Sequence, residues 1–96
     1  MSSIRTRAHD PANYIETPED ALFLLEAAFE EGETGVIAEA IGAVARSKGM
    51  SEIAEATGLS RESLYRALSA NGNPTLSTTL EVLKALGLRL TVTEDA

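Results

Sequence analysis

The side chains between Ser60 and Arg66 could form hydrogen bonds with the edges of DNA bases. An arginine can bind guanine through two hydrogen bonds, and a glutamate can accept one from cytosine. Leu64 interrupts this polar run and is expected to face inward with Ala67 and Leu68. Five residues are therefore predicted to contact bases: Ser60, Arg61, Glu62, Tyr65 and Arg66.

Two short helices joined by a tight turn would position these side chains. In the first helix, Ile53, Ala54 and Thr57 share one face. Gly58 can adopt the positive φ at which many helices end. Ser51 and Ser60 are expected to cap the two helices, because a hydroxyl oxygen can accept a hydrogen bond from a free backbone N–H group. Residues 50–69 thus predict a helix-turn-helix whose second helix enters the major groove. A plain helical hairpin is the alternative.

Basic and polar side chains around this unit are expected to contact DNA phosphates, which position a protein on the duplex. These residues are Arg46, Lys48, Ser51, Ser69 and Asn71.

Charge is distributed unevenly along the 96 residues, whose net charge is −7. Residues 10–39 contain nine acidic residues and no lysine or arginine, whereas residues 40–90 contain six basic and four acidic residues. This asymmetry suggests two different partners. A basic protein is expected to contact the acidic surface of Glu26, Glu30, Glu31 and Glu33, and solvated charge is the alternative.

The remaining pattern predicts an all-α fold of five helices. A helix over residues 18–31 begins with Thr17 as its cap and Pro18 in its first turn. Its inner stripe is expected to contain Leu22, Leu25, Ala28 and Phe29. A second helix, residues 34–48, is stopped by Gly49. A last helix, capped by Thr75 and closed by Gly87, is expected to bury Leu76, Leu80, Leu83 and Leu86.

Residues 88–93 alternate between apolar and polar side chains, which predicts a short β-strand. Because it is the only strand expected, its partner would be a second copy of the chain or another protein. Residues 1–9 are expected to be a disordered tail, and residues 10–96 to form a single domain.

Catalysis is not expected from this composition. His9 is the sole histidine, there is no cysteine, and the serines have no neighbouring base at a recognisable spacing. We therefore expect no enzyme activity, cofactor or metal site. The sequence has no apolar run approaching the ~20 residues of a membrane span, and the lack of cysteine agrees with a cytoplasmic location.

With these residues in view, the chain resembles the HigA-like helix-turn-helix antitoxins, the addiction module antidote proteins of bacterial type II toxin–antitoxin systems. The resemblance is carried by residues 17–20, 29–32, 49–54, 57–68, 72–75 and 83–88. It implies a phage-repressor-like domain, a homodimer, and a RelE-like toxin partner. It also implies neutralisation of that toxin and repression of the protein's own operon through operator DNA.

Two alternatives to this dual role remain open. The chain could be a stand-alone or phage-type transcriptional repressor without a toxin. It could also be a toxin-binding protein whose helix-turn-helix no longer binds DNA.

Overall fold

This computed structural model describes residues 10–95, which contain five α-helices and one short 3-10 helix. In chain order they are η1 (Pro11–Tyr14), α2 (Pro18–Glu31), α3 (Thr34–Lys48), α4 (Met50–Thr57), α5 (Arg61–Ala67) and α6 (Leu76–Ala85). The prediction of an all-α fold with five α-helices is confirmed. The expected disordered tail, residues 1–9, lies outside the described residues.

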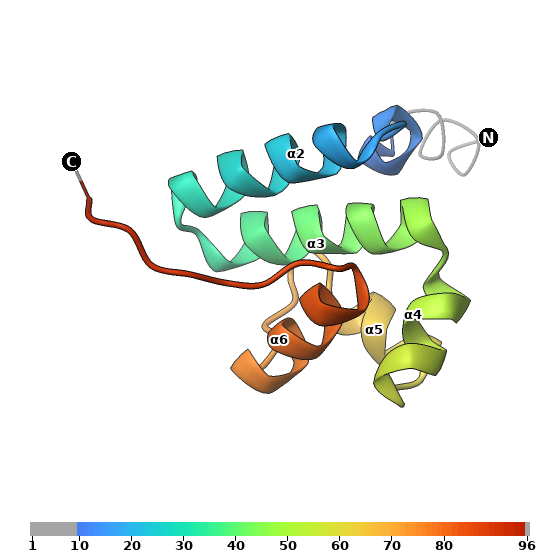
Figure 1. Cartoon of the computed structure of the whole chain (residues 1–96). Coiled ribbons are helices and arrows are strands. Elements are labelled where there is room, and N and C mark those ends of the chain that lie inside the picture. Colours follow the sequence, from blue (N-terminus) through green and yellow to red (C-terminus); the bar gives the residue numbers. More distant parts are fainter. Residues whose placement is uncertain (1–9, 96) are drawn as a thin grey trace.

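Helix α3 occupies the centre of the molecule. It lies alongside α2 on one side, and α4, α5 and α6 lie on its other side (Figure 1). It contacts α2, η1, α4 and α5. The core therefore forms around α3 and includes Ile41 and Val44 from α3, Ile53 from α4, Leu64 from α5 and Val82 from α6.

Local capping explains where most helices begin. At α2, the Thr17 hydroxyl accepts a hydrogen bond from the Asp20 backbone N–H (3.1 Å), and the Asp20 carboxylate accepts one from the Thr17 N–H (3.1 Å). Hydrogen bonds from the backbone N–H groups of Glu16 (3.0 Å) and Thr17 to the Asp20 carboxylate lower the pKa of Asp20 from its ordinary value of 3.8. Ser60 and Thr75 cap α5 and α6 as predicted, because their hydroxyl oxygens accept hydrogen bonds from the backbone N–H groups of Ser63 and Thr78.

The predicted cap at Ser51 is wrong. Helix α4 begins at Met50, directly after Gly49, and no side chain caps it. Gly49 has φ 121° and ψ 110°, a conformation that glycine adopts easily and that lets the chain change direction within one residue. The new helix therefore starts one residue before Ser51, whose side chain is exposed.

The predicted inner face of α6 is only partly correct. Leu83 is buried, but Leu76 is 68% exposed and Leu80 45% exposed, while Val82 and Thr79 are buried instead. Thr79 can be buried because its hydroxyl donates to the Thr75 carbonyl (2.9 Å). The side of α6 that carries Thr79 and Val82 therefore faces the core.

In α2 the predicted stripe is also narrower than expected. Leu25 and Ala28 are buried, whereas Leu22 and Phe29 are exposed at one edge of the stripe. Only the residues that directly face α3 are covered.

The predicted C-terminal strand over residues 88–93 is wrong. Helix α6 ends in a Schellman motif, in which Leu88 N–H donates to the Leu83 carbonyl (2.8 Å) and Gly87 N–H to that of Lys84 (3.0 Å). Leu88 packs against the core, and the segment beyond it is exposed and extends away from the helices (Figure 1). Residues 10–95 contain no strand that could pair with this segment, so its alternating pattern produces no sheet.

Two glycines of α3 allow this helix to lie close to the residues at the end of α5 and just after it. A Cβ atom at Gly42 would lie closer than 3.0 Å to the carbonyl oxygen of Leu68, and one at Gly35 closer than 3.0 Å to that of Ala70. The small residues of α3 therefore set how near α5 lies to the core.

No helix within residues 10–95 is long and apolar enough to cross a membrane.

Candidate functional site

Helices α4 and α5 pack against each other and are joined by residues 58–60. Gly58 ends α4 in the left-handed conformation (φ 77°). The Thr57 hydroxyl donates to the Ile53 carbonyl (2.8 Å) and accepts from the Leu59 N–H (3.3 Å), which holds the turn. Buried Ile53 and Leu64 attach the two helices to the core. The turn and the two buried side chains therefore determine where α5 lies relative to α4.

The structure places all the predicted base-contact residues on α5 or at its cap, and all are exposed. Tyr65 is 43% exposed, and within residues 10–95 neither Arg61 nor Arg66 forms an ion pair. Ser60 is already engaged, because its hydroxyl accepts from the Ser63 N–H (3.0 Å). Ser63 is itself exposed on α5 and was not among the five predicted residues. A serine at this position in the polar run could have been predicted to contact bases.

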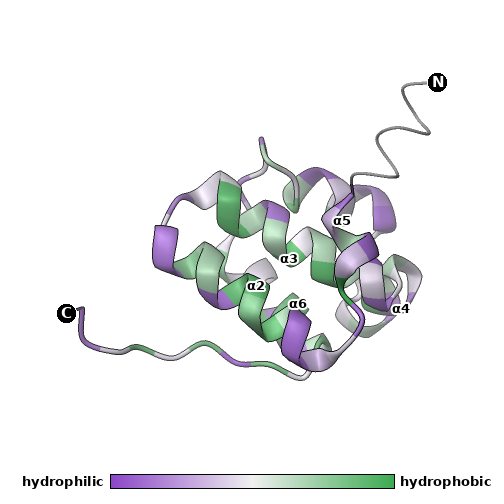
Figure 2. Ribbon diagram, turned by 90° about the horizontal axis from the view of Figure 1, so that it is seen from above, coloured by the Kyte–Doolittle hydropathy of each residue, from purple (hydrophilic) through white to green (hydrophobic). Residues whose placement is uncertain are grey.

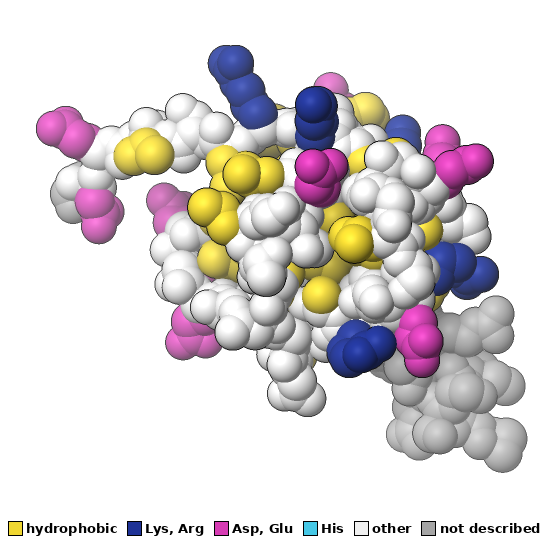
Figure 3. Space-filling view, turned by 90° about the horizontal axis from the view of Figure 1, so that it is seen from below, with side chains coloured by type: hydrophobic (Ala, Val, Ile, Leu, Met, Phe, Trp, Pro, Cys, Tyr) yellow, Lys and Arg dark blue, Asp and Glu magenta, His cyan; other side chains and the backbone are white. Residues whose placement is uncertain are grey.

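Charge on this side of the molecule is mixed. Figure 3 shows the face formed by α4, α5 and α6, with lysine and arginine side chains around its edge and acidic side chains between them. Apolar side chains appear near the middle of the face and beside the C-terminal segment. The basic groups are thus separate points and do not merge into one broad basic patch.

The predicted phosphate-contact residues are placed less uniformly. Lys48, Ser51 and Asn71 are exposed. The Ser69 hydroxyl donates to the Arg66 carbonyl at the end of α5 (3.0 Å).

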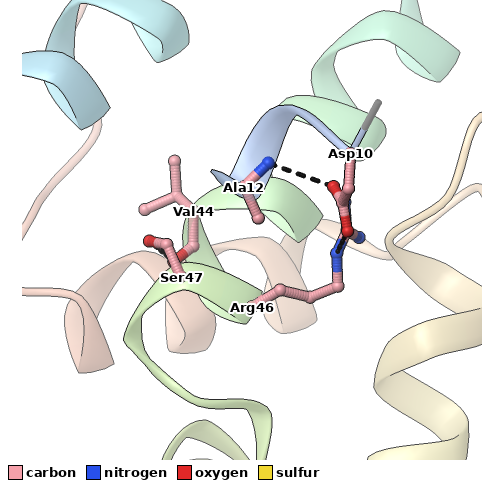
Figure 4. Close-up of polar contacts among 5 residues, drawn as sticks. All are labelled: Asp10, Ala12, Val44, Arg46 and Ser47. Carbon is pink, nitrogen blue, oxygen red and sulfur yellow. Dashed lines mark hydrogen bonds and ion pairs between the residues drawn. The ribbon is translucent and has the colours of Figure 1, made fainter. Parts of the chain in front are cut away.

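Arg46 is already paired within the fold. Its Nε donates to Oδ2 of Asp10 (3.0 Å), and a second nitrogen of its guanidinium donates to the other carboxylate oxygen (Figure 4). Asp10 also accepts from the Ala12 N–H (3.0 Å), so it caps η1 and ties it to α3. The Arg46 side chain is the largest cause that lowers the pKa of Asp10 from 3.8. A phosphate would have to compete with Asp10 for this arginine.

We expect Asp10→Asn to lower the free energy of unfolding near neutral pH by about 1 kcal/mol, the upper range for a partly exposed ion pair. Because the folded-state pKa lies below 3.8, the pair stabilises the fold above that pH and loses this effect as the pH falls through the folded pKa. Urea unfolding at about pH 6 and at a series of pH values below 3.8 follows this loss. A difference from the unaltered chain that does not shrink as the pH falls would contradict this reason. Glu55→Gln, which changes an exposed carboxylate on α4, is the control.

One of the acidic residues predicted to contact a partner lies at a groove. The predicted partner-contact residues Glu26, Glu30, Glu31 and Glu33 are all exposed. Of these, only Glu31 lines a groove of about 250 Å³ between α2 and α3. Glu39 of α3 also lines it, and the sequence reasoning did not select this residue. Its helical spacing with Val36 and Ala43 could have placed these three residues on one side of α3.

Nearly the whole chain is similar to known proteins. Residues 5–94 match a family model described as "Probable addiction module antidote protein". A protein of Haemophilus influenzae (strain Rd), described as an uncharacterized protein, is 40% identical over 86 residues, which cover 90% of this chain and 89% of that protein. No solved structure gives a significant match. The chain therefore belongs to the family of probable addiction module antidote proteins.

Proposed function

We propose that this chain is a DNA-binding antitoxin that neutralises a RelE-like toxin and represses its own operon. Membership of an antidote family implies a toxin partner of some kind. The observation that supports DNA binding is the exposed, polar outer face of α5. Buried Leu64 fixes this helix to the core, and a three-residue turn joins it to α4. We infer a binding protein and no catalytic role.

In this proposal α4 and α5 act as a helix-turn-helix, with α5 in the major groove. Ser60, Arg61, Glu62, Tyr65 and Arg66 would contact bases, and Arg46, Lys48, Ser51, Ser69 and Asn71 would contact phosphates. Lys48, Ser51 and Asn71 are exposed and support this role most directly. Operator binding would place the protein in the cytoplasm.

We also propose that the chain acts as a homodimer. Leu76 and Leu80 lie next to the buried row of α6 and are 68% and 45% exposed, and Val92 is 92% exposed in the C-terminal segment. Apolar side chains that cluster on a surface mark contact sites with other proteins. A second copy that covers α6 would bury Leu76 and Leu80 and would present two α5 helices to a two-fold operator. Sedimentation equilibrium that finds only a 10.2 kDa monomer would contradict the dimer.

The toxin half of the proposal rests on charge. The acidic surface of Glu26, Glu30, Glu31 and Glu33 would attract a basic toxin, because opposite potentials speed association and favour the correct partner. This surface lies on α2 and the following turn, and the base-contact residues lie on α5. One chain could therefore bind both partners at once.

A stand-alone or phage-type repressor remains the second candidate, favoured by the same exposed face of α5. Such a repressor differs from the antitoxin only in that it has no toxin partner.

Co-expression tests the proposal. The product of the gene next to this chain's own gene should stop bacterial growth when expressed alone. Growth should return when this chain is expressed with it, and the two proteins should purify together. A neighbouring product that is harmless, or that this chain neither binds nor neutralises, would contradict the antitoxin role and leave the repressor.

A further inference from the structure

The groove between α2 and α3 has an apolar floor. Ala28, Ala40 and Ala43 are buried beneath it, and Leu24 and Val36 are half-buried at its sides. In Figure 2, α2 and α3 lie side by side, and apolar residues occupy the neighbouring stretches of both helices. The small alanine side chains leave the groove unfilled, so an apolar group placed there would be removed from water at little steric cost.

Two carboxylates lie at the groove. Glu31 is in the last turn of α2 and Glu39 is in the middle of α3, and both are exposed. Within residues 10–95 neither forms an ion pair. No lysine or arginine occurs in residues 10–39, and Arg46, which follows the groove residue Ala43 by one turn of α3, is paired with Asp10.

The groove volume, about 250 Å³, indicates the size of the occupant. It falls below the roughly 300–1,000 Å³ of sites that enclose a small-molecule ligand. It suits one or two aliphatic side chains from a protein surface.

We propose that this groove is the toxin-contact site, and that it receives an aliphatic side chain flanked by lysine or arginine on the toxin surface. This inference rests on the proposed antitoxin function and narrows its acidic surface to Glu31 and Glu39. The apolar floor removes the aliphatic group from water, and the two carboxylates pair with the flanking cations. Glu26 and Glu30 do not line the groove, so they contribute only long-range attraction.

Two variants test the charge and the shape of the groove separately, with the product of the adjacent gene as the probe. Glu31→Lys combined with Glu39→Lys should weaken binding about tenfold or more, because two cations would face the toxin's own. Glu26→Lys combined with Glu30→Lys makes the same change in net charge and should weaken binding no more than about threefold. Ala27→Gln places a polar group in the groove and should weaken toxin binding about tenfold. Ala56→Gln, which changes an exposed residue of α4, should leave toxin binding unchanged.

Circular dichroism confirms that each variant is folded, and calorimetric titration measures its affinity. Equal losses from the two charge-reversed pairs would overturn the groove as the site and leave a diffuse acidic attraction. Toxin affinity that stays normal while the groove variants change the chain's own sedimentation would overturn the toxin as occupant and assign the groove to a second copy. If the unaltered chain does not bind the probe, the proposed function itself is contradicted, and the groove assignment with it.

Discussion

Gly42→Ala is expected to lower the free energy of unfolding by about 2 kcal/mol, within the usual range for overpacking a core. The added Cβ would overlap the Leu68 carbonyl oxygen, which belongs to the backbone and cannot turn away. The better helix propensity of alanine offsets only about 0.5–1 kcal/mol of that cost. For a chain of this length the change corresponds to a melting temperature lower by about 10 °C. Thermal and urea unfolding, at one protein concentration, measure it.

Gly58→Ala provides the comparison for Gly42→Ala. A Cβ at Gly58 meets no atom within 4 Å, so only its positive φ is costly, at about 1–2 kcal/mol. Because only the Cβ at Gly42 would overlap backbone atoms, Gly42→Ala should lower the melting temperature more than Gly58→Ala does. An unchanged melting temperature for Gly42→Ala would contradict the close approach of α3 to α5.

Arg61→Ala and Arg66→Ala are each expected to weaken operator binding by about 1–3 kcal/mol, which is the usual discrimination of a bidentate contact with guanine. Both arginines are exposed on α5 and are free of ion pairs within the described residues, so no internal partner has to be broken before DNA binds. Fluorescence anisotropy with DNA from upstream of the protein's own gene measures the change.

Arg89→Ala is the matched control, because it removes an exposed arginine that lies outside α5. It should leave DNA affinity within about twofold of the unaltered chain. Toxin binding should be unchanged in the Arg61 and Arg66 variants. Equal losses for DNA and toxin would contradict two separate binding surfaces.

Features that depend on a few neighbouring residues were predicted well from the sequence. Thr17, Ser60 and Thr75 cap their helices, and Gly58 ends α4, because each needs only backbone groups within four residues. The outward set on α5 was predictable for the same reason, since Leu64 fixes which side of a short helix faces the core.

Features that depend on distant contacts were predicted less well. The face of α6 follows from how Val82 and Thr79 meet the rest of the core, which helical periodicity alone does not specify. The residues after Leu88 alternate like a strand, but a strand requires a hydrogen-bonded neighbour, which residues 10–95 do not provide. The groove joins Glu31 and Glu39 across two helices, and only their packing brings them together.

The most direct measurement is a titration of the protein against DNA from upstream of its own gene, at two salt concentrations and with competitor DNA. If α5 reads the operator, the complex survives the competitor, and its affinity falls as salt rises because phosphate contacts release counterions. If no complex forms at either salt concentration, or if competitor DNA removes it equally well, α5 does not read DNA and the proposed repressor activity is wrong.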